Sequence, residues 1–181
     1  MNWKVLHSEY LFNEPWLTIR KEVCSLPNGK MVPAYYILEY PTWVNALALT
    51  KEGKVVMVRQ YRHGLGVVDL EVVGGVVDKG EDPETAIRRE LLEETGYRFA
   101  SFELLGRSCA NPATTNNYTY FYLATGGEKV AAQNLDETED IEVVLLDMDE
   151  LKNLLRSNGI VQALHTTCIF YGLEKLGLLQ Y

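Results

Sequence analysis

The chain has 181 residues, of which 47% are hydrophobic and 23% are charged, a composition typical of an ordinary globular protein with one well-formed core. Its formal net charge of −8 disfavours nucleic acid as a partner, because phosphate backbones are bound by clustered Lys and Arg. No apolar run approaches the roughly 20 residues that span a bilayer, and the N-terminus lacks the apolar stretch of a signal peptide. We therefore expect a cytoplasmic protein that has no membrane partner.

The first forty residues predict a small antiparallel β element. Two strand-like runs, Trp16–Cys24 and Val32–Tyr40, flank a turn that contains Asn-Gly, a strong hairpin signal. We assign residues 1–42 to this N-terminal β element and residues 43–181 to the main domain.

The main domain begins with three further strand-like runs, Trp43–Leu49, Val55–Tyr61 and Val67–Val77. The third run is mostly apolar and β-branched, which favours a buried strand. It leads directly into the most informative segment of the chain.

That segment predicts a helix between Asp82 and Gly96. Asp82 can accept the N-cap hydrogen bonds, and Pro83 suits the first turn, where a missing N–H costs nothing. Gly96 fits the left-handed stop at the other end. The apolar stripe that would face the core consists of Ala86, Ile87 and Leu91.

Beyond the helix, strands and helices continue to alternate. Strands are expected at Phe102–Arg107, Tyr118–Ala124 and Val143–Asp147, and helical segments at Leu151–Arg156 and Val161–Leu176. This order predicts an α/β protein in which a mixed sheet is covered by helices on both faces.

The predicted helix carries Glu90, Glu93 and Glu94 on neighbouring positions. Residues three and four apart on a helix are surface neighbours, and like charges so placed cost roughly 0.2–0.5 kcal/mol per pair. A divalent cation would remove that penalty, and oxygen ligands suit hard ions such as Mg²⁺. The alternative is a solvated acidic helix face, which most charge runs are.

The spacing around these glutamates is informative. Gly75 is followed after five residues by Glu81, and after seven more by Arg89-Glu90-Leu91, any residue, Glu93-Glu94, any residue, Gly96 and the apolar Tyr97. This pattern resembles the Nudix box, with Tyr97 in place of an aliphatic residue as the one departure. The resemblance implies a Nudix-type α/β/α sandwich with a mixed β-sheet, and metal-dependent hydrolysis of nucleoside diphosphates linked to another moiety.

The resemblance also implies roles for the residues of the box. Glu90 and Glu94 would be the main ligands of Mg²⁺ or Mn²⁺, with Glu93 and Glu81 close behind. Arg89 would orient a ligand carboxylate rather than touch phosphate. The carbonyl oxygen of Gly74 is a further candidate ligand.

The flanking segments are similar to the branch of ADP-ribose pyrophosphatases. They are Val58-Arg59-Gln60-Tyr61-Arg62 and Leu70-Glu71-Val72-Val73-Gly74-Gly75, together with Pro112, fifteen residues after Tyr97. The branch implies that Arg62, and with less support Arg59, contacts the phosphates of the substrate. An equally open alternative is that each arginine is a surface residue paired with a carboxylate.

The general base is expected on a late acidic loop, again by resemblance. Glu137 aligns best with the branch and Glu139 is the reserve. A solvated acidic loop is equally compatible with the composition.

The loop Ala110–Thr114 departs from the Ser-Pro-Gly-Phe of the branch, so the substrate is less firmly predicted than the reaction. ADP-ribose is the first candidate substrate, and GDP-mannose or another nucleotide sugar is the second. A non-catalytic nucleotide-sugar-binding module is the alternative of another class, although such a module would be expected to lose box carboxylates. The resemblance further implies a homodimer in which the N-terminal β element serves as a dimerisation subdomain.

Other conspicuous residues are expected to be structural. Trp16, Trp43 and Tyr35 are expected to pack in the core rather than to stack on a nucleobase. The cysteines, Cys24, Cys109 and Cys168, are expected to be reduced. His165 on the last predicted helix is expected to be a core or surface histidine and not a ligand.

Overall fold

The computed structural model describes residues 1–179. The chain divides into two compact units. The first unit consists of Met1–Pro41 and Cys109–Tyr118, and the second of Thr42–Ser108 and Thr119–Tyr181. Across the described residues, no helix combines the length and apolar character needed to cross a membrane.

The first unit is built on an antiparallel sheet in the order β1-β2-β3. The two predicted strands are confirmed as β2 (Leu17–Ser25) and β3 (Met31–Glu39), whereas β1 (Lys4–Glu14) was not predicted. Every residue of β1 is exposed in the chain, so its sequence carries no alternation between a buried and a solvated face. Trp16, expected in the core, is 75% exposed in the turn between β1 and β2, so that expectation is wrong.

The second segment of the first unit runs alongside β3. The backbone N–H of Leu38 donates to the carbonyl oxygen of Thr114 over 2.7 Å, and Leu38 and Thr115 form a parallel bridge. The side chain of Asn117 donates to the carbonyl oxygen of Pro41 over 2.8 Å. Residues distant in sequence thus complete one unit.

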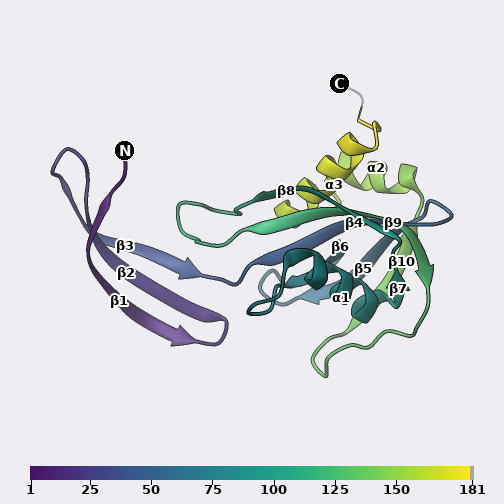
Figure 1. Cartoon of the computed structure of the whole chain (residues 1–181), viewed down its shortest axis with the longest axis horizontal. Helices are drawn as coiled ribbons and strands as arrows, with labels where there is room; N and C mark the ends of the chain where they lie inside the picture. Colours follow the sequence, from purple (N-terminus) through teal and green to yellow (C-terminus); the bar gives the residue numbers. More distant parts are fainter. Residues whose placement is uncertain (180–181) are drawn as a thin grey trace. The chain divides into compact units, whose positions relative to one another are not determined.

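In the described part of the second unit, a mixed sheet of seven strands has the order β10-β5-β6-β4-β9-β7, with β8 paired to β9 (Figure 1). The strands are β4 (Trp43–Thr50), β5 (Val55–Arg62), β6 (Val67–Val76), β7 (Tyr97–Arg98), β8 (Ser101–Ser108), β9 (Thr119–Lys129) and β10 (Ile141–Leu146). The pairing of β4 with β9 is parallel, and the other pairings are antiparallel. The short β7 was not predicted.

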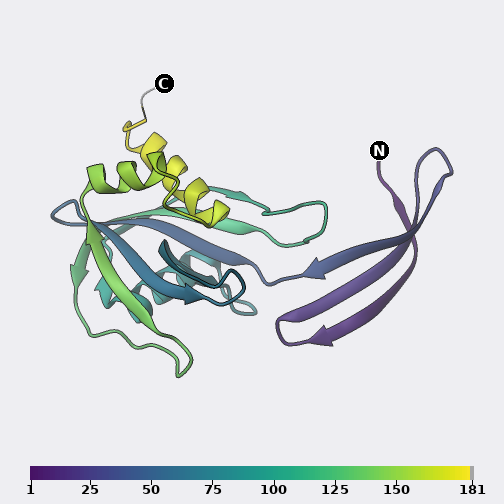
Figure 2. The ribbon, with the colours of Figure 1, turned by 180° about the vertical axis from the view of Figure 1, so that it is seen from behind.

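Helices cover both faces of this sheet. Helix α1 (Pro83–Thr95) packs on one face, and α2 (Met148–Arg156) and α3 (Ala163–Lys175) lie together on the other (Figures 1 and 2). The α/β/α sandwich and the mixed sheet expected from the sequence are therefore confirmed. Helix α2 begins three residues before the predicted segment because Asp147 and Glu150 form a capping box.

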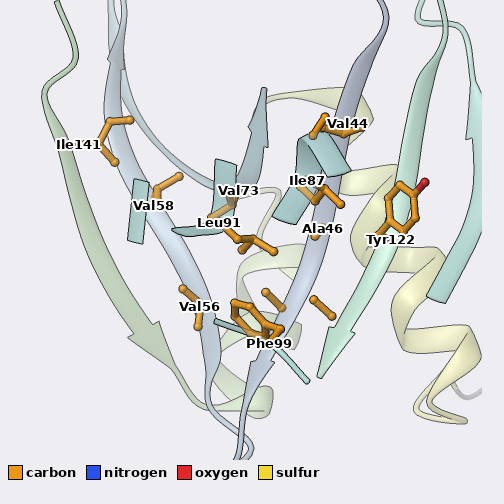
Figure 3. Close-up of a cluster of buried hydrophobic side chains, with 13 residues drawn as sticks. Val44, Ala46, Val56, Val58, Val73, Ile87, Leu91, Phe99, Tyr122 and Ile141 are labelled. Atoms are coloured by element: carbon orange, nitrogen blue, oxygen red, sulfur yellow. The ribbon is translucent and has the colours of Figure 1, made fainter. Parts of the chain in front are cut away.

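Two apolar clusters fill the sandwich, one on each face. Figure 3 shows the cluster under α1, where Ile87 and Leu91 meet Val44, Val58 and Val73 from three strands. The next residues along those strands, such as Met57 and Val72, enter the cluster under α2 and α3. Because side chains alternate along a strand, a sheet buried on both faces needs nearly continuous apolar runs. Cys24 and Cys168 are buried, and all three cysteines are free thiols.

Candidate active site

Helix α1 forms as its sequence predicts. The Asp82 side chain accepts hydrogen bonds from the backbone N–H groups of Glu84 and Thr85 over 3.0 and 3.1 Å. At the other end, Gly96 adopts a φ of 71° and donates its N–H to Leu92. The buried face of the helix includes Ala86, Ile87 and Leu91 as expected, and also Glu94. One of the metal-ligand candidates is thus turned toward the sheet.

A single guanidinium organises the other glutamates of the site. Arg89 donates to both carboxylate oxygens of Glu81 over 3.2 and 3.1 Å, to Glu90 over 2.9 Å and to Glu93 over 3.2 Å. It also donates to the carbonyl oxygen of Val76 over 3.0 Å. The five contacts match the five N–H donors of a guanidinium. Arg89 lowers the pKa of Glu81, and these carboxylates raise the pKa of Arg89.

The two glycines at the end of β6 allow close approach. A Cβ atom at Gly75 would overlap the carboxyl group of Glu90, and one at Gly74 would overlap the Asn45 side chain and the carbonyl oxygen of Val44. Neither glycine has a positive φ, so space is the requirement, not backbone freedom. Glu90 is therefore seated directly on the backbone of β6, near the end of the strand that precedes the helix.

Glu94 is the most perturbed carboxylate of the site. It is 5% exposed, and within the described chain its Oε2 atom has no hydrogen-bond partner. Burial, reinforced by the charges of Glu90 and Glu139, raises the pKa of Glu94 to about 9, and Arg62 opposes the shift. Burial also raises the pKa of Glu90 despite Arg89. A buried, unpaired carboxylate among other carboxylates holds a proton or a cation.

These donors fit a divalent metal ion. They are all oxygen atoms, which hard cations prefer, and the unpartnered oxygen of Glu94 would gain a ligand bond. Among residues 1–179, however, no three Asp, Glu, His or Cys side chains are already gathered in a metal-binding arrangement. Glu81 and Glu93 are engaged by Arg89, so the ligand set of Glu90, Glu94, Glu93, Glu81 and Gly74 stays a prediction.

The two candidate phosphate-binding arginines differ in position. Arg62 bonds through two nitrogens to Glu71, and its charge acts on Glu94. Arg59 follows Val58 of the α1-side cluster, so strand alternation turns its side chain to the opposite face. There it forms an ion pair of 2.6 Å with Glu142. The structure brings Arg62 to the glutamate site, whereas it places Arg59 in an ion pair at the surface.

The late acidic loop approaches the end of α1. Gln133 donates to the carbonyl oxygens of Glu94 and Ile141 over 2.7 and 2.9 Å, which ties the loop between the helix and β10. The charge of Glu139 acts on both Glu90 and Glu94. Glu137 and Glu139 are both exposed, so the choice between these two candidates for the general base stays a prediction.

Pro112 belongs to the first unit. It lies in a turn closed by hydrogen bonds from Thr114 and Thr115 to the carbonyl oxygen of Asn111 over 3.0 and 2.9 Å. The Tyr35 hydroxyl donates to the carbonyl oxygen of Ala113. The substrate role of Pro112 stays a prediction.

Sequence reasoning missed one residue of the site, Glu71. It is fully buried on β6 and accepts hydrogen bonds from Arg62 and from Gln60, the latter over 3.2 Å. The available signal was an acidic residue inside an otherwise apolar strand, since buried carboxylates are rarely left unpaired.

A mixed sheet between helix layers, with a glutamate-bearing helix seated on the Gly-Gly pair near the end of β6, defines the class of Nudix hydrolases. Residues 40–164 match the NUDIX domain, and residues 3–38 match the nucleoside diphosphate sugar hydrolase N-terminal domain. The chain belongs to the Nudix family and is a Nudix hydrolase.

Individual proteins agree with this assignment. The chain is 31% identical to the methanol dehydrogenase activator of Bacillus methanolicus, with 93% of this chain and 91% of the relative covered. It is also 31% identical to the ADP-ribose pyrophosphatase of Bacillus subtilis, with the same coverage. A crystal structure of an ADP compounds hydrolase superposes with a TM-score of 0.85 at 19% identity, over 99% of this chain and 98% of that one. This last likeness concerns the fold.

Proposed function

We propose that this protein hydrolyses the diphosphate linkage of a nucleoside diphosphate sugar, and that ADP-ribose is cleaved to AMP and ribose 5-phosphate. The observation that carries the proposal is the Glu90–Glu94 pair beside Gly74 and Gly75 of β6, in which Glu94 is buried with an unpartnered oxygen. The relative from Bacillus subtilis, an ADP-ribose pyrophosphatase, supports this substrate. GDP-mannose or another nucleotide sugar is the alternative substrate.

Glu90 and Glu94 would hold the metal ion, with Mg²⁺ or Mn²⁺ as the proposed species. A divalent ion bound there would polarise the phosphoryl group and lower the pKa of the attacking water. Arg89 keeps Glu90 and Glu93 in register through hydrogen bonds of 2.9 and 3.2 Å. Arg62 contacts the substrate phosphates in this proposal, and Arg59 and Pro112 are kept as further substrate contacts.

A glutamate of the late loop accepts the proton of the attacking water. Sequence favours Glu137 for this task, whereas the electrostatic influence of Glu139 on Glu90 and Glu94 favours Glu139. Separate Gln variants at the two positions distinguish them, because the base carries the larger loss of kcat.

A screen for hydrolysis tests the function. ADP-ribose, nucleotide sugars, dinucleoside polyphosphates and nucleoside triphosphates are offered with Mg²⁺, and the products are identified. We expect ADP-ribose to give AMP and ribose 5-phosphate. Turnover of triphosphates alone would contradict the assignment to the branch of ADP-ribose pyrophosphatases. Turnover of none of these compounds would leave a binding module as the better description.

Two variants on α1 provide matched controls for the screen. Glu94→Gln should lower kcat by more than about 100-fold, the upper end of the cost of losing an outer-shell partner of a metal ligand. Glu84→Gln removes a glutamate from the exposed side of the same helix, where it pairs with Arg88, and should keep normal turnover.

The first unit, and residues 1–42 in particular, is proposed to mediate a homodimer, with residues 43–181 as the hydrolase domain. Large apolar side chains are exposed on it at Trp3, Tyr10, Phe12 and Trp16, and larger exposed apolar areas are typical of interaction surfaces. We propose a cytoplasmic location, which the three free thiols support, and no nucleic-acid partner for a chain of net charge −8.

A further inference from the structure

A buried histidine of the second unit has no part in the proposed reaction. His165, in the first turn of α3, is 5% exposed. Its Nδ1 atom has no hydrogen-bond partner in the described chain and lies 3.7 Å from Oε2 of Glu71. An unpaired buried polar atom is costly, and this one is directed at a carboxylate just beyond hydrogen-bonding distance.

The carboxylate that it faces depends on one cation. Glu71 is fully buried, and in the described residues its ion pair with Lys or Arg is the one with Arg62. Gln60 adds a neutral hydrogen bond. Asp69 on the same strand and Glu94 on α1 are further charges coupled to Glu71, and both are negative. Removing a partner from a buried charge is strongly destabilising.

His165 is neutral while this ion pair persists. Burial lowers its pKa to about 4; Glu71 opposes the shift and Arg62 adds to it. If Arg62 moved away, its positive charge would no longer oppose protonation of His165. The negative charge of Glu71, which favours protonation of His165, would no longer be offset by Arg62. The Arg62 side chain is 47% exposed, so its guanidinium reaches solvent and is accessible to an anionic ligand.

We propose that His165 is a positioning residue that takes a proton when Arg62 leaves Glu71 to bind the substrate diphosphate. The proton comes from solvent to Nδ1 and forms a charged hydrogen bond to Oε2 of Glu71; it returns to solvent when Arg62 returns. This keeps Glu71 paired at every stage. The inference rests on the proposed phosphate-binding role of Arg62 and adds a proton to the binding equilibrium.

The first test needs no substrate. The sequence has three histidines, and His7 and His63 are exposed, so imidazole ¹⁵N NMR titrations can distinguish the buried one. In Arg62→Met, Glu71 permanently lacks its cation, and we expect the proton affinity of His165 to rise at least tenfold. In the double variant Arg62→Met/Glu71→Gln, the proton affinity of His165 should fall again, because the carboxylate that attracts the proton is gone. If His165 in Arg62→Met titrates as in the wild type, Glu71 takes the proton itself and the proposal is overturned.

The second test uses the unmodified protein. The protein is first saturated with Mg²⁺, so that any proton released by Glu94 is already lost. Binding of the non-hydrolysable α,β-methylene analogue of ADP-ribose is then measured by calorimetry at pH 7.5 in buffers of different ionisation enthalpy. The wild type should take up as much as one proton per site, and His165→Asn, which cannot be protonated, should take up none. His7→Asn is the matched control and should behave as the wild type.

Steady-state kinetics with ADP-ribose gives an independent readout. The wild-type KM should rise by up to tenfold per pH unit between the pKa of His165 in the free protein and its higher pKa in the complex, and should level off above the latter. In His165→Asn the KM should not show this rise, and the difference between the two proteins should fall on KM rather than on kcat. Binding without proton uptake, or equal uptake in His165→Asn, would overturn this inference alone. Absence of both binding and turnover would instead refute the proposed function.

Discussion

At the scale of single residues, the site depends on where side chains are missing as much as on where they are present. Glu90 occupies the space in which Gly75 would carry a Cβ atom, so the carboxylate is held against the backbone of β6. A helix carrying the same glutamates, docked one methyl group further away, would present them in a different place. Gly75 therefore sets the distance between the helix and β6.

Gly75→Ala should displace Glu90 and lower kcat strongly. Forcing extra carbon atoms into a packed site costs about 1–3 kcal/mol, and misplacing a reacting group by about 1 Å can cost 100-fold in rate. Activity and thermal unfolding are measured together. Gly64→Ala is the control, because Gly64 has open space around it and no positive φ. Equal effects of the two substitutions would contradict this role for Gly75.

Glu94 should make the metal-free protein less stable as pH rises. Its pKa is about 9 in the folded chain against an ordinary value of 4.5, so between these values the folded state holds a proton that the unfolded state has lost. The stability present below pH 4.5 is then lost toward pH 9, by up to about 1.4 kcal/mol per pH unit.

The measurement compares urea unfolding of the wild type and Glu94→Gln in EDTA from pH 5 to 9. The wild type should lose stability relative to the variant as pH rises, because Gln mimics the neutral acid. Added Mg²⁺ should restore the wild type at high pH and release a proton on binding. A pH-independent difference would mean that Glu94 is ionised throughout.

At the scale of the secondary-structure element, α1 acts as a frame with both ends fixed. Its N-terminus is capped by Asp82 and its C-terminus is closed by Gly96, so the register of the glutamates along the helix is determined locally. Asp147 caps α2 in a similar way, but α2 carries none of the proposed ligands.

Asp82→Ala should therefore affect both stability and metal binding. Loss of the cap should lower the thermal midpoint by about 2–4 °C and should raise the Mg²⁺ concentration needed for half-maximal activity. Asp147→Ala is the matched control, with a comparable thermal shift and an unchanged Mg²⁺ requirement. If both variants change the metal requirement equally, the effect is one of general stability.

The elements differ in how well the sequence predicted them, for physical reasons. Helix α1 was predicted to within a residue because its caps and apolar stripe are local. Strand β1 was missed because it has no buried face in the chain. The role of Glu71 and its proximity to His165 were also missed, since they arise when β5, β6 and α3 meet. Non-local pairings of this kind leave only a weak trace in sequence, here an acidic residue within an apolar strand.

At the scale of the whole molecule, the first unit presents its apolar side chains to solvent. If these form the proposed dimer interface, the particle in solution should have twice the 20.5 kDa mass of one chain. Trp16→Glu places a charge at a side chain that is 75% exposed and should shift the population toward the monomer, because burying an unpaired charge is unfavourable.

Sedimentation equilibrium measures the mass of both forms. Phe170→Glu, at a side chain of α3 that is 45% exposed in the second unit, is the matched control and should leave the dimer intact. A wild-type monomer, or a Trp16→Glu variant with an unchanged mass, would remove the proposed interface.

The first unit draws on two stretches of chain, one before Thr42 and one between β8 and β9. The polypeptide therefore passes between the units at three points in sequence. Cutting after residue 41 would not excise the first unit cleanly, because Cys109–Tyr118 would remain behind. That segment would lose β3, to which the bridge between Leu38 and Thr115 now joins it. Exchange of this unit between relatives, in evolution or in the laboratory, requires two grafts that match each other.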